Sequence, residues 1–131
     1  PLDGRSLLDA VRGVADWRAV IDLEHDICYG PENHWNALTD GKFKYIFHAR
    51  DGKEQLFDLE KDPGESADLS NDPAYAPALA HWREQMIAHL APRGDAWVQN
   101  GQLALRPESI LHSPNYPASV DSPDRRGAAP A

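Results

Sequence analysis

The chain has 131 residues, of which 26% are charged and 41% are hydrophobic, and its formal net charge is −8. This length gives room for one domain with a modest core. The acidic balance argues against a nonspecific nucleic-acid binder and against a polybasic membrane-surface module, because both rely on concentrated lysine and arginine. No apolar run reaches the roughly eighteen residues that a transmembrane helix needs.

The single cysteine and the start of the chain say little about the compartment. Cys28 has no second cysteine to pair with in an internal disulfide, so the redox environment and the localisation stay unknown. The chain opens on the polar segment PLDGRS, with neither an initiator methionine nor a signal peptide. That opening is typical of a fragment of a longer protein.

The first two predicted elements are a short helix and a strand. Residues 6–13 begin with a capping serine and end at a glycine, which favours a helix with too little apolar surface to be stable alone. Residues 17–29 alternate between apolar and acidic side chains, and this period of two predicts a strand with one face buried. We expect Ile21 and Leu23 on the buried face and Asp22 on the wet one.

Two Asp-Gly pairs predict tight turns between further strands. Residues 40–41 suit a type I′ turn, in which both central residues need positive φ, and residues 51–52 predict the next turn. The strands that these turns join are expected at residues 34–39, 42–48 and 55–59. In the middle strand Phe43, Tyr45 and Phe47 share one face, which predicts an antiparallel sheet whose apolar face must be covered.

A long helix supplies the cover. After Asp72-Pro73, a stripe of apolar side chains recurs at helical spacing, and it consists of Tyr75, Leu79, Trp82, Met86 and Leu90. Residues 91–94 end this helix, and residues 97–106 predict a final turn or short strand. The fold class is therefore α+β, with a small antiparallel sheet of about four strands covered by one long amphipathic helix, and an extended C-terminal tail. The expected core consists of Phe43, Tyr45, Phe47, Leu56 and Trp82.

A family resemblance rests on three segments, which are DGRSLL at residues 3–8, NALTDGKFKYIF at residues 36–47 and EQLFDLEKDPGESADL at residues 54–69. In this order they resemble the C-terminal region of type I sulfatases, the arylsulfatase branch of the alkaline-phosphatase-like superfamily. The resemblance implies three parts. They are a connecting segment from an absent catalytic domain (1–19), the sulfatase α+β subdomain (20–105) and an extended or disordered tail (106–131).

The resemblance also implies where the chemistry of such a protein lies. A large catalytic domain, packed on the subdomain, carries a formylglycine made from the cysteine of a C-x-P-x-R motif, and a divalent metal, usually calcium, that helps hold the sulfate. In this chain Cys28 is followed by Tyr-Gly-Pro-Glu, so it does not fit the motif and is not the nucleophile. No acidic metal cluster of the family type occurs in the sequence. We therefore expect no catalytic residue, metal or cofactor in this chain and no activity from it alone.

Four residues are candidates for a substrate pocket, because the resemblance implies that the edge of the sheet borders that pocket. They are His25, His34, Trp35 and Asn36, with Glu24 beside them. Histidine and asparagine suit hydrogen bonds to a polar sulfate ester, and tryptophan suits stacking on a ring. The alternative is structural, with Trp35 packed in the core and His34 capping a strand end.

Other charged and ligating residues have simpler interpretations. A zinc site of His25, His34 and His48 is disfavoured, because three strands do not guarantee one shared face and such sites need a closed ligand set. Lys42 fits a solvated turn, and the role of Lys44 stays open. The acidic residues between 58 and 68 lack the spacing of a calcium loop, so they predict a solvated connection with capping carboxylates.

Three functions remain in competition. The first is the C-terminal subdomain of a sulfatase, which completes the fold and one wall of the substrate pocket. The second is the same role in a phosphonate monoester or phosphodiester hydrolase, and the third is a stand-alone interaction module without catalysis. The first predicts an apolar face that is uncovered without the catalytic domain, and hence self-association of the isolated chain.

Overall fold

The computed structural model describes residues 7–13, 18–25 and 33–107. Its elements in chain order are α1 (Leu7–Val11), β1 (Ile21–His25), β2 (Trp35–Thr39), β3 (Phe43–His48), β4 (Glu54–Asp58), the 3₁₀ turn η2 (Pro73–Tyr75), α2 (Ala76–Leu90), the 3₁₀ turn η3 (Ala91–Arg93), β5 (Val98–Gln99) and β6 (Gln102–Leu103). Within this described part, no helix combines the length and the apolar character that crossing a membrane requires. Cys28 and residues 108–131 lie outside the described residues.

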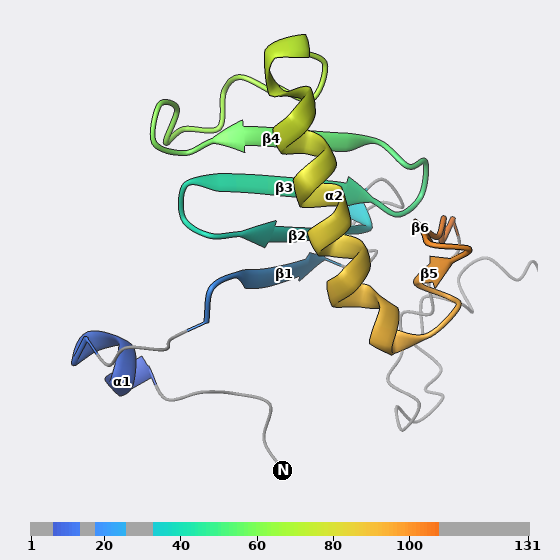
Figure 1. Ribbon diagram of the computed structural model, residues 1–131, viewed down its shortest axis with the longest axis horizontal. Helices are drawn as coiled ribbons and strands as arrows, with labels where there is room; N and C mark the ends of the chain where they lie inside the picture. Colours follow the sequence, from blue (N-terminus) through green and yellow to red (C-terminus); the bar gives the residue numbers. More distant parts are fainter. Residues whose placement is uncertain (1–6, 14–17, 26–32, 108–131) are drawn as a thin grey trace, which may run out of the picture.

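Strands β1 to β4 form one antiparallel sheet in chain order, and α2 runs across one of its faces (Figure 1). Antiparallel strands in chain order need only short connections, and the two Asp-Gly pairs supply two of them. The predicted α+β class, a small sheet covered by one long helix, is confirmed.

The core lies between this sheet and α2. Strands β2, β3 and β4 each contribute one fully buried side chain to it, namely Leu38, Tyr45 and Leu56, and α2 contributes Trp82, Met86 and Leu90. Burying side chains of this size stabilises a fold by roughly 1.5–3 kcal/mol each. The predicted core residues are all present, although Phe43 is only partly buried at its margin.

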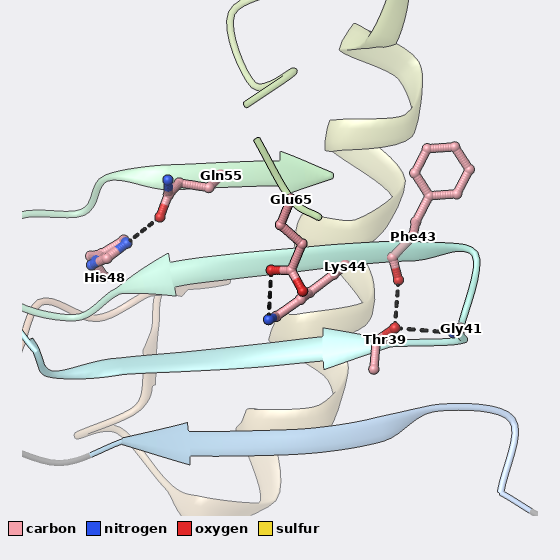
Figure 2. A network of polar contacts seen from close by, with 7 residues as sticks. All are labelled: Thr39, Gly41, Phe43, Lys44, His48, Gln55 and Glu65. Atoms are coloured by element: carbon pink, nitrogen blue, oxygen red, sulfur yellow. Dashed lines mark hydrogen bonds and ion pairs between the residues drawn. The ribbon is translucent and has the colours of Figure 1, made fainter. Parts of the chain in front are cut away.

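The turn between β2 and β3 follows from side-chain chemistry. Gly41 has φ +87°, a conformation that side chains rarely adopt. Asp40 Oδ1 accepts hydrogen bonds from the backbone amides of Lys42 and Phe43, each at 2.8 Å. Thr39 Oγ1 accepts from the amide of Gly41 at 3.0 Å and donates to the carbonyl of Phe43 at 2.8 Å (Figure 2). The predicted hairpin is confirmed, but its turn is not type I′, because Gly41 has positive φ and Asp40 does not.

The prediction for β1 is wrong as to which face is buried. Ile21 and Leu23 are 47% and 39% exposed, respectively. Leu23 pairs with Ala37, whereas Asp22 pairs with Leu38, whose side chain is in the core, so the acidic face of β1 points toward α2. The reason is Arg93 in η3, just after that helix, whose Nη2 lies 3.7 Å from Asp22 Oδ2.

The acidic connection between β4 and α2 is built by carboxylates that accept hydrogen bonds. Asp58 accepts from the amide of Lys61 at 3.1 Å, and Asp68 Oδ1 accepts from the amide of Leu56 at 3.2 Å. Asp72 caps η2 by accepting from the amide of Ala74 at 2.9 Å. These contacts agree with the predicted connection with capping carboxylates.

A second, two-stranded sheet is formed by β5 and β6, after α2 and η3. The amide of Ala104 donates to the carbonyl of Trp97 at 2.9 Å, which holds the base of this hairpin. The amide of Arg106 then donates to the carbonyl of Ala49 at 2.6 Å, so the chain returns to the end of β3. The sequence analysis expected a final turn or short strand in this region, and the hairpin confirms it.

Candidate functional site

A small hollow lies where β1 ends and β2 begins, and we call it the β1–β2 hollow. Its volume is about 60 Å³, and it is lined by Glu24, His25, His34, Trp35, Asn36 and Trp97. The strand register explains the gathering, because Glu24 pairs with Asn36 and His25 pairs with Trp35. All four candidate pocket residues therefore line one concave site. Trp97 joins them from the start of the β5–β6 hairpin.

His25 and Trp35 form the part of the hollow that lies on the sheet face away from α2. Their rings stack with centroids 5.6 Å apart and planes inclined by 19°. His25 Nδ1 lies 2.8 Å from the carbonyl oxygen of Asn33. A carbonyl only accepts, so Nδ1 carries the proton in this contact. Trp35 is half-buried, so it does not fill the core as the structural alternative proposed.

His34 and Asn36 form the buried part of the hollow, with exposed fractions of 7% and 4%. His34 Nδ1 donates to the backbone carbonyl of Arg106 at 3.1 Å. The guanidinium of the same arginine donates through Nη2 to Asn36 Oδ1. Buried polar groups need such partners to offset the loss of water. One residue, Arg106, therefore holds both candidates in place.

Two arginine side chains lie over the ring of Trp97. The guanidinium carbon of Arg106 lies 4.0 Å from the ring centroid, and that of Arg93 lies 4.7 Å from it. Contacts of this kind contribute about 0.5–2 kcal/mol. Arg93 also forms an ion pair with Glu24. The rim of the hollow thus connects β1 with η3 and with the β5–β6 hairpin.

The sequence analysis missed Arg93, Trp97 and Arg106 as parts of the site. A tryptophan and an arginine after the predicted helix were visible, and they were interpreted only as a turn and a tail. Their contacts with β1 and β2 depend on where the hairpin folds back, which no local pattern encodes.

Lys44 and His48 lie on the open face of the sheet, which is the face away from α2, and His48 pairs with Trp35 of the hollow (Figure 2). Lys44 Nζ donates to Glu65 Oε2 at 2.8 Å, so its charge is paired within the chain. His48 Nε2 lies 2.7 Å from Gln55 Oε1. Lys42 is exposed, with Nζ 4.0 Å from a carboxylate oxygen of Glu60.

The described residues do not offer a donor set for the metal that the family resemblance implies. Across residues 7–13, 18–25 and 33–107, no group of three or more His, Cys, Asp or Glu is placed to hold an ion. Divalent calcium takes several oxygen ligands at once. No metal or formylglycine chemistry is therefore assigned to this chain's residues.

A larger cavity of about 440 Å³ lies between α2, the β3–β4 turn and the β5–β6 hairpin. Its polar wall is a bidentate ion pair in which Arg83 donates to both oxygens of Glu54 at 2.6 Å. Tyr45 donates to the same carboxylate at 2.5 Å. Burial acts to raise the pKa of Glu54, but the hydrogen bonds from Arg83 and Tyr45 outweigh it and hold that pKa below its usual value. Burial raises the pKa of Tyr45 above its ordinary range, so the phenol stays protonated and donates.

Comparison with known proteins shows which proteins this chain is similar to. No protein-family model matches the sequence. An arylsulfatase of Clostridium perfringens is 31% identical over 103 residues, which are 78% of this chain and 21% of the relative. A choline-sulfatase of Rhizobium meliloti is 36% identical over 91 residues, or 66% of this chain and 17% of the relative. This chain is similar to a part of sulfatases.

Solved structures agree with that assignment. A 2-O GAG sulfatase shares 26% identity with this chain at a TM-score of 0.62, over 72% of this chain and 21% of the other. A phosphonate monoester hydrolase of Agrobacterium radiobacter matches 81% of this chain and 25% of its own, at 24% identity and a TM-score of 0.53, which is a likeness of fold alone. The chain spans about a fifth of the length of the curated relatives that it matches. The predicted resemblance to the C-terminal region of sulfatases is confirmed.

Proposed function

We propose that this region is the C-terminal subdomain of a sulfate ester hydrolase, that it packs on a larger catalytic domain, and that the β1–β2 hollow forms part of one wall of the substrate pocket. The observation that carries the proposal is the match of most of this chain to only about a fifth of sulfatases. The remaining length of such a protein has room for the catalytic domain. Sulfatase relatives of up to 36% identity favour this family's reaction over others of the same fold.

The reaction of the whole protein would be the hydrolysis of a sulfate ester to an alcohol or phenol and sulfate. A formylglycine and a divalent metal in the catalytic domain would supply the attack on sulfur and hold the sulfate group. The role of this chain would be to complete the fold and to orient the part of the substrate that leaves with the alcohol. The convergence of His25, His34, Trp35 and Asn36 on one hollow supports that role.

The open face of the sheet, which is the face away from α2, is evidence for a large partner domain. Ile21 and Leu23 expose apolar surface there, on the side away from α2. Exposed apolar surface that continues across a sheet commonly marks an interface. We propose that the catalytic domain covers this face, and that the isolated chain self-associates through it.

A phosphonate monoester hydrolase is the second candidate, because one such enzyme has the same fold. The two candidates differ in the bond that is broken, so one assay separates them. A longer protein that contains this chain after a sulfatase-type catalytic region should be tested on an aryl sulfate and on an aryl phosphonate monoester. The same protein without residues 20–107, and the 131-residue chain alone, complete the comparison.

We expect the longer protein to hydrolyse the aryl sulfate faster than the phosphonate. Removal of residues 20–107 should lower kcat/KM strongly, and the chain alone should show no turnover. A preference for the phosphonate would favour the second candidate. Turnover of the sulfate ester by the chain alone, at a rate like that of the longer protein, would overturn the subdomain role. A chain that is monomeric and stable alone, with no effect of its removal, would favour the interaction module.

A further inference from the structure

We infer that β1 is a releasable edge strand, which a cluster of charges holds against the end of α2. This cluster, which we call the ionic clamp, consists of Asp22 and Glu24 on β1, His89 in α2 and Arg93 in η3. When the clamp is weakened, β1 separates from the sheet and takes Glu24 and His25 out of the β1–β2 hollow, while the core stays folded. The inference concerns the chain by itself, so it holds or fails independently of the proposed function.

The core lacks side chains from β1. Among the described residues, the buried core side chains all lie between Leu38 and Leu90. Ile21 and Leu23 lie on the open face of the sheet, and Val20, just before the strand, reaches only the margin of the core. The apolar surface that holds β2, β3 and β4 to α2 therefore does not hold β1. Segments with so few buried apolar contacts open at a lower free energy than the core does.

The two edges of the sheet differ in how they are attached (Figure 1). β4, at the opposite edge from β1, buries Leu56 in the core. The outer side of β4 is also paired, because the amide of Leu69 donates to the carbonyl of Leu56 at 2.8 Å and the amide of Leu56 donates to Asp68 Oδ1 at 3.2 Å. Within residues 7–13, 18–25 and 33–107, no such backbone bond forms on the outer side of β1. β1 therefore depends on its pairing with β2 and on its contacts with the end of the helix.

The ionic clamp takes the place of apolar contacts on the helix side of β1. The register pairs Asp22 with Leu38 and so directs its carboxylate toward α2. The Oδ2 atom of Asp22 lies 3.4 Å from His89 Nε2 and 3.7 Å from Arg93 Nη2. Glu24, two residues along the same face of the strand, forms an ion pair with Arg93 Nη1. One guanidinium therefore joins both carboxylates of the clamp.

The clamp is accessible to dissolved salt. Its four side chains are between 31% and 42% exposed, and ion pairs of this exposure are weak and screened by salt. The screening length falls from about 10 Å at 0.1 M salt to about 3 Å at 1 M, which is shorter than the contacts of Asp22 with His89 and Arg93. Arg93 carries a permanent charge, and His89 adds one when it is protonated. Arg18 Nη1, at 4.0 Å from Asp22 Oδ1, also faces the clamp and is screened in the same way.

Release of β1 would dismantle the β1–β2 hollow on one side. Two of its lining residues, Glu24 and His25, come from β1. The ring of His25 stacks on that of Trp35, with centroids 5.6 Å apart, and this contact would be lost. Trp97 would keep Arg106 over its ring, because neither residue belongs to β1. Ionic strength would therefore control one wall of the hollow and leave the other in place.

The first test is amide hydrogen exchange on the 131-residue chain, followed by NMR at one constant pH in 0.1 M and in 1 M sodium chloride. Amides that pair β1 with β2 are compared with amides that pair β3 with β4. We expect the β1–β2 amides to exchange about three- to tenfold faster at the higher salt, relative to the β3–β4 amides, because several weak ion pairs are screened together. Equal changes in both sets, or no change in the β1–β2 set, would overturn the inference.

The second test removes one charge of the clamp. Asp22→Asn keeps the shape of the side chain and loses the charge that faces His89 and Arg93. We expect its β1–β2 amides to exchange at the lower salt nearly as fast as those of the wild type do at the higher salt, and to respond less when salt is added. Asp95→Asn, the same change at an exposed aspartate, is the matched control and should keep the response of the wild type. An unaltered salt response in Asp22→Asn would contradict the clamp.

The same spectra test the link between the clamp and the hollow. The indole signal of Trp35 should move toward its position in Asp22→Asn as salt is added to the wild type, whereas the signal of Trp82, in the core, should stay in place. Faster exchange of β1 with an unmoved Trp35 signal would overturn the control of the hollow by the clamp. Unchanged β3–β4 amides in Asp22→Asn would show that its core is intact, and the salt experiment on the wild type does not depend on that variant.

Discussion

Arg106 lies with its guanidinium carbon 4.0 Å from the ring centroid of Trp97, and the same guanidinium donates to the side chain of Asn36. Through these contacts the β5–β6 hairpin is bound to the start of β2. The β1–β2 hollow depends on this link, because Trp97 forms one of its walls.

Replacing Arg106 should therefore loosen the hollow and the hairpin together. Arg106→Met keeps much of the length of the side chain but removes the bond to Asn36 and the charge over Trp97. We expect a loss of about 1–3 kcal/mol in the free energy of unfolding, measured by urea denaturation. Arg50→Met changes an exposed arginine and is the control. Equal stability of the two variants would contradict the role given to Arg106.

The network of Tyr45, Glu54 and Arg83 predicts a dependence of stability on pH. The pKa of Glu54 is held below its usual value of 4.5, so its contribution to stability is full above that pH and is lost as the pH falls through the folded-state pKa. We expect the urea midpoint of the wild type to fall as the pH is lowered from 5. The midpoint of Glu54→Gln should fall less steeply over the same range. Glu60→Gln, at a 64% exposed side chain, should keep the steep dependence of the wild type.

The open face of the sheet predicts how the isolated chain behaves. Leu23→Thr should lower self-association in sedimentation experiments and leave the melting temperature nearly unchanged, because Leu23 is already 39% exposed. Leu105→Thr changes a leucine that is 57% exposed and lies beside the β5–β6 hairpin. If both variants reduced association equally, the open face would not be the specific contact.

Two glycines allow a matched test of backbone and packing effects. Gly41 and Gly52 have φ +87° and +77°, so alanine at either position is strained and costs roughly 1–3 kcal/mol. A Cβ at Gly52 would also lie 3.1 Å from Leu105 Cδ2, whereas nothing lies within 4 Å at Gly41. We expect thermal unfolding to show a larger loss for Gly52→Ala than for Gly41→Ala. The excess should disappear when Leu105→Ala is added, and its persistence would contradict the contact.

Local sequence patterns predicted most of the fold, because the strands, the turn and the helix each depend on residues that are close together in the sequence. The alternation of Phe43, Tyr45 and Phe47 needs only the period of a strand, and the turn at Gly41 needs only its neighbours Asp40 and Thr39. The stripe on α2 likewise states which side of the helix is apolar. These features are confirmed by the register of β2 and β3 and by the core.

Features that depend on distant residues were not predicted. Alternation in β1 indicated two different faces, but the position of Arg93 decides which of them meets α2. The bond between Asn36 and Arg106 joins residues that are 70 positions apart. The sequence therefore predicted His25 and His34 as candidate site residues. It did not predict that the β5–β6 hairpin completes the hollow around them.

The long separation of Asn36 from Arg106 has a consequence for synthesis on the ribosome. The buried core side chains of the sheet and α2 all lie between Leu38 and Leu90, so they can pack as soon as this segment has emerged. The hollow cannot close until Arg106 has also left the exit tunnel, since domains fold as their segments become available. We therefore expect a nascent chain paused after α2 to have its core in place while the β1–β2 hollow is still unformed.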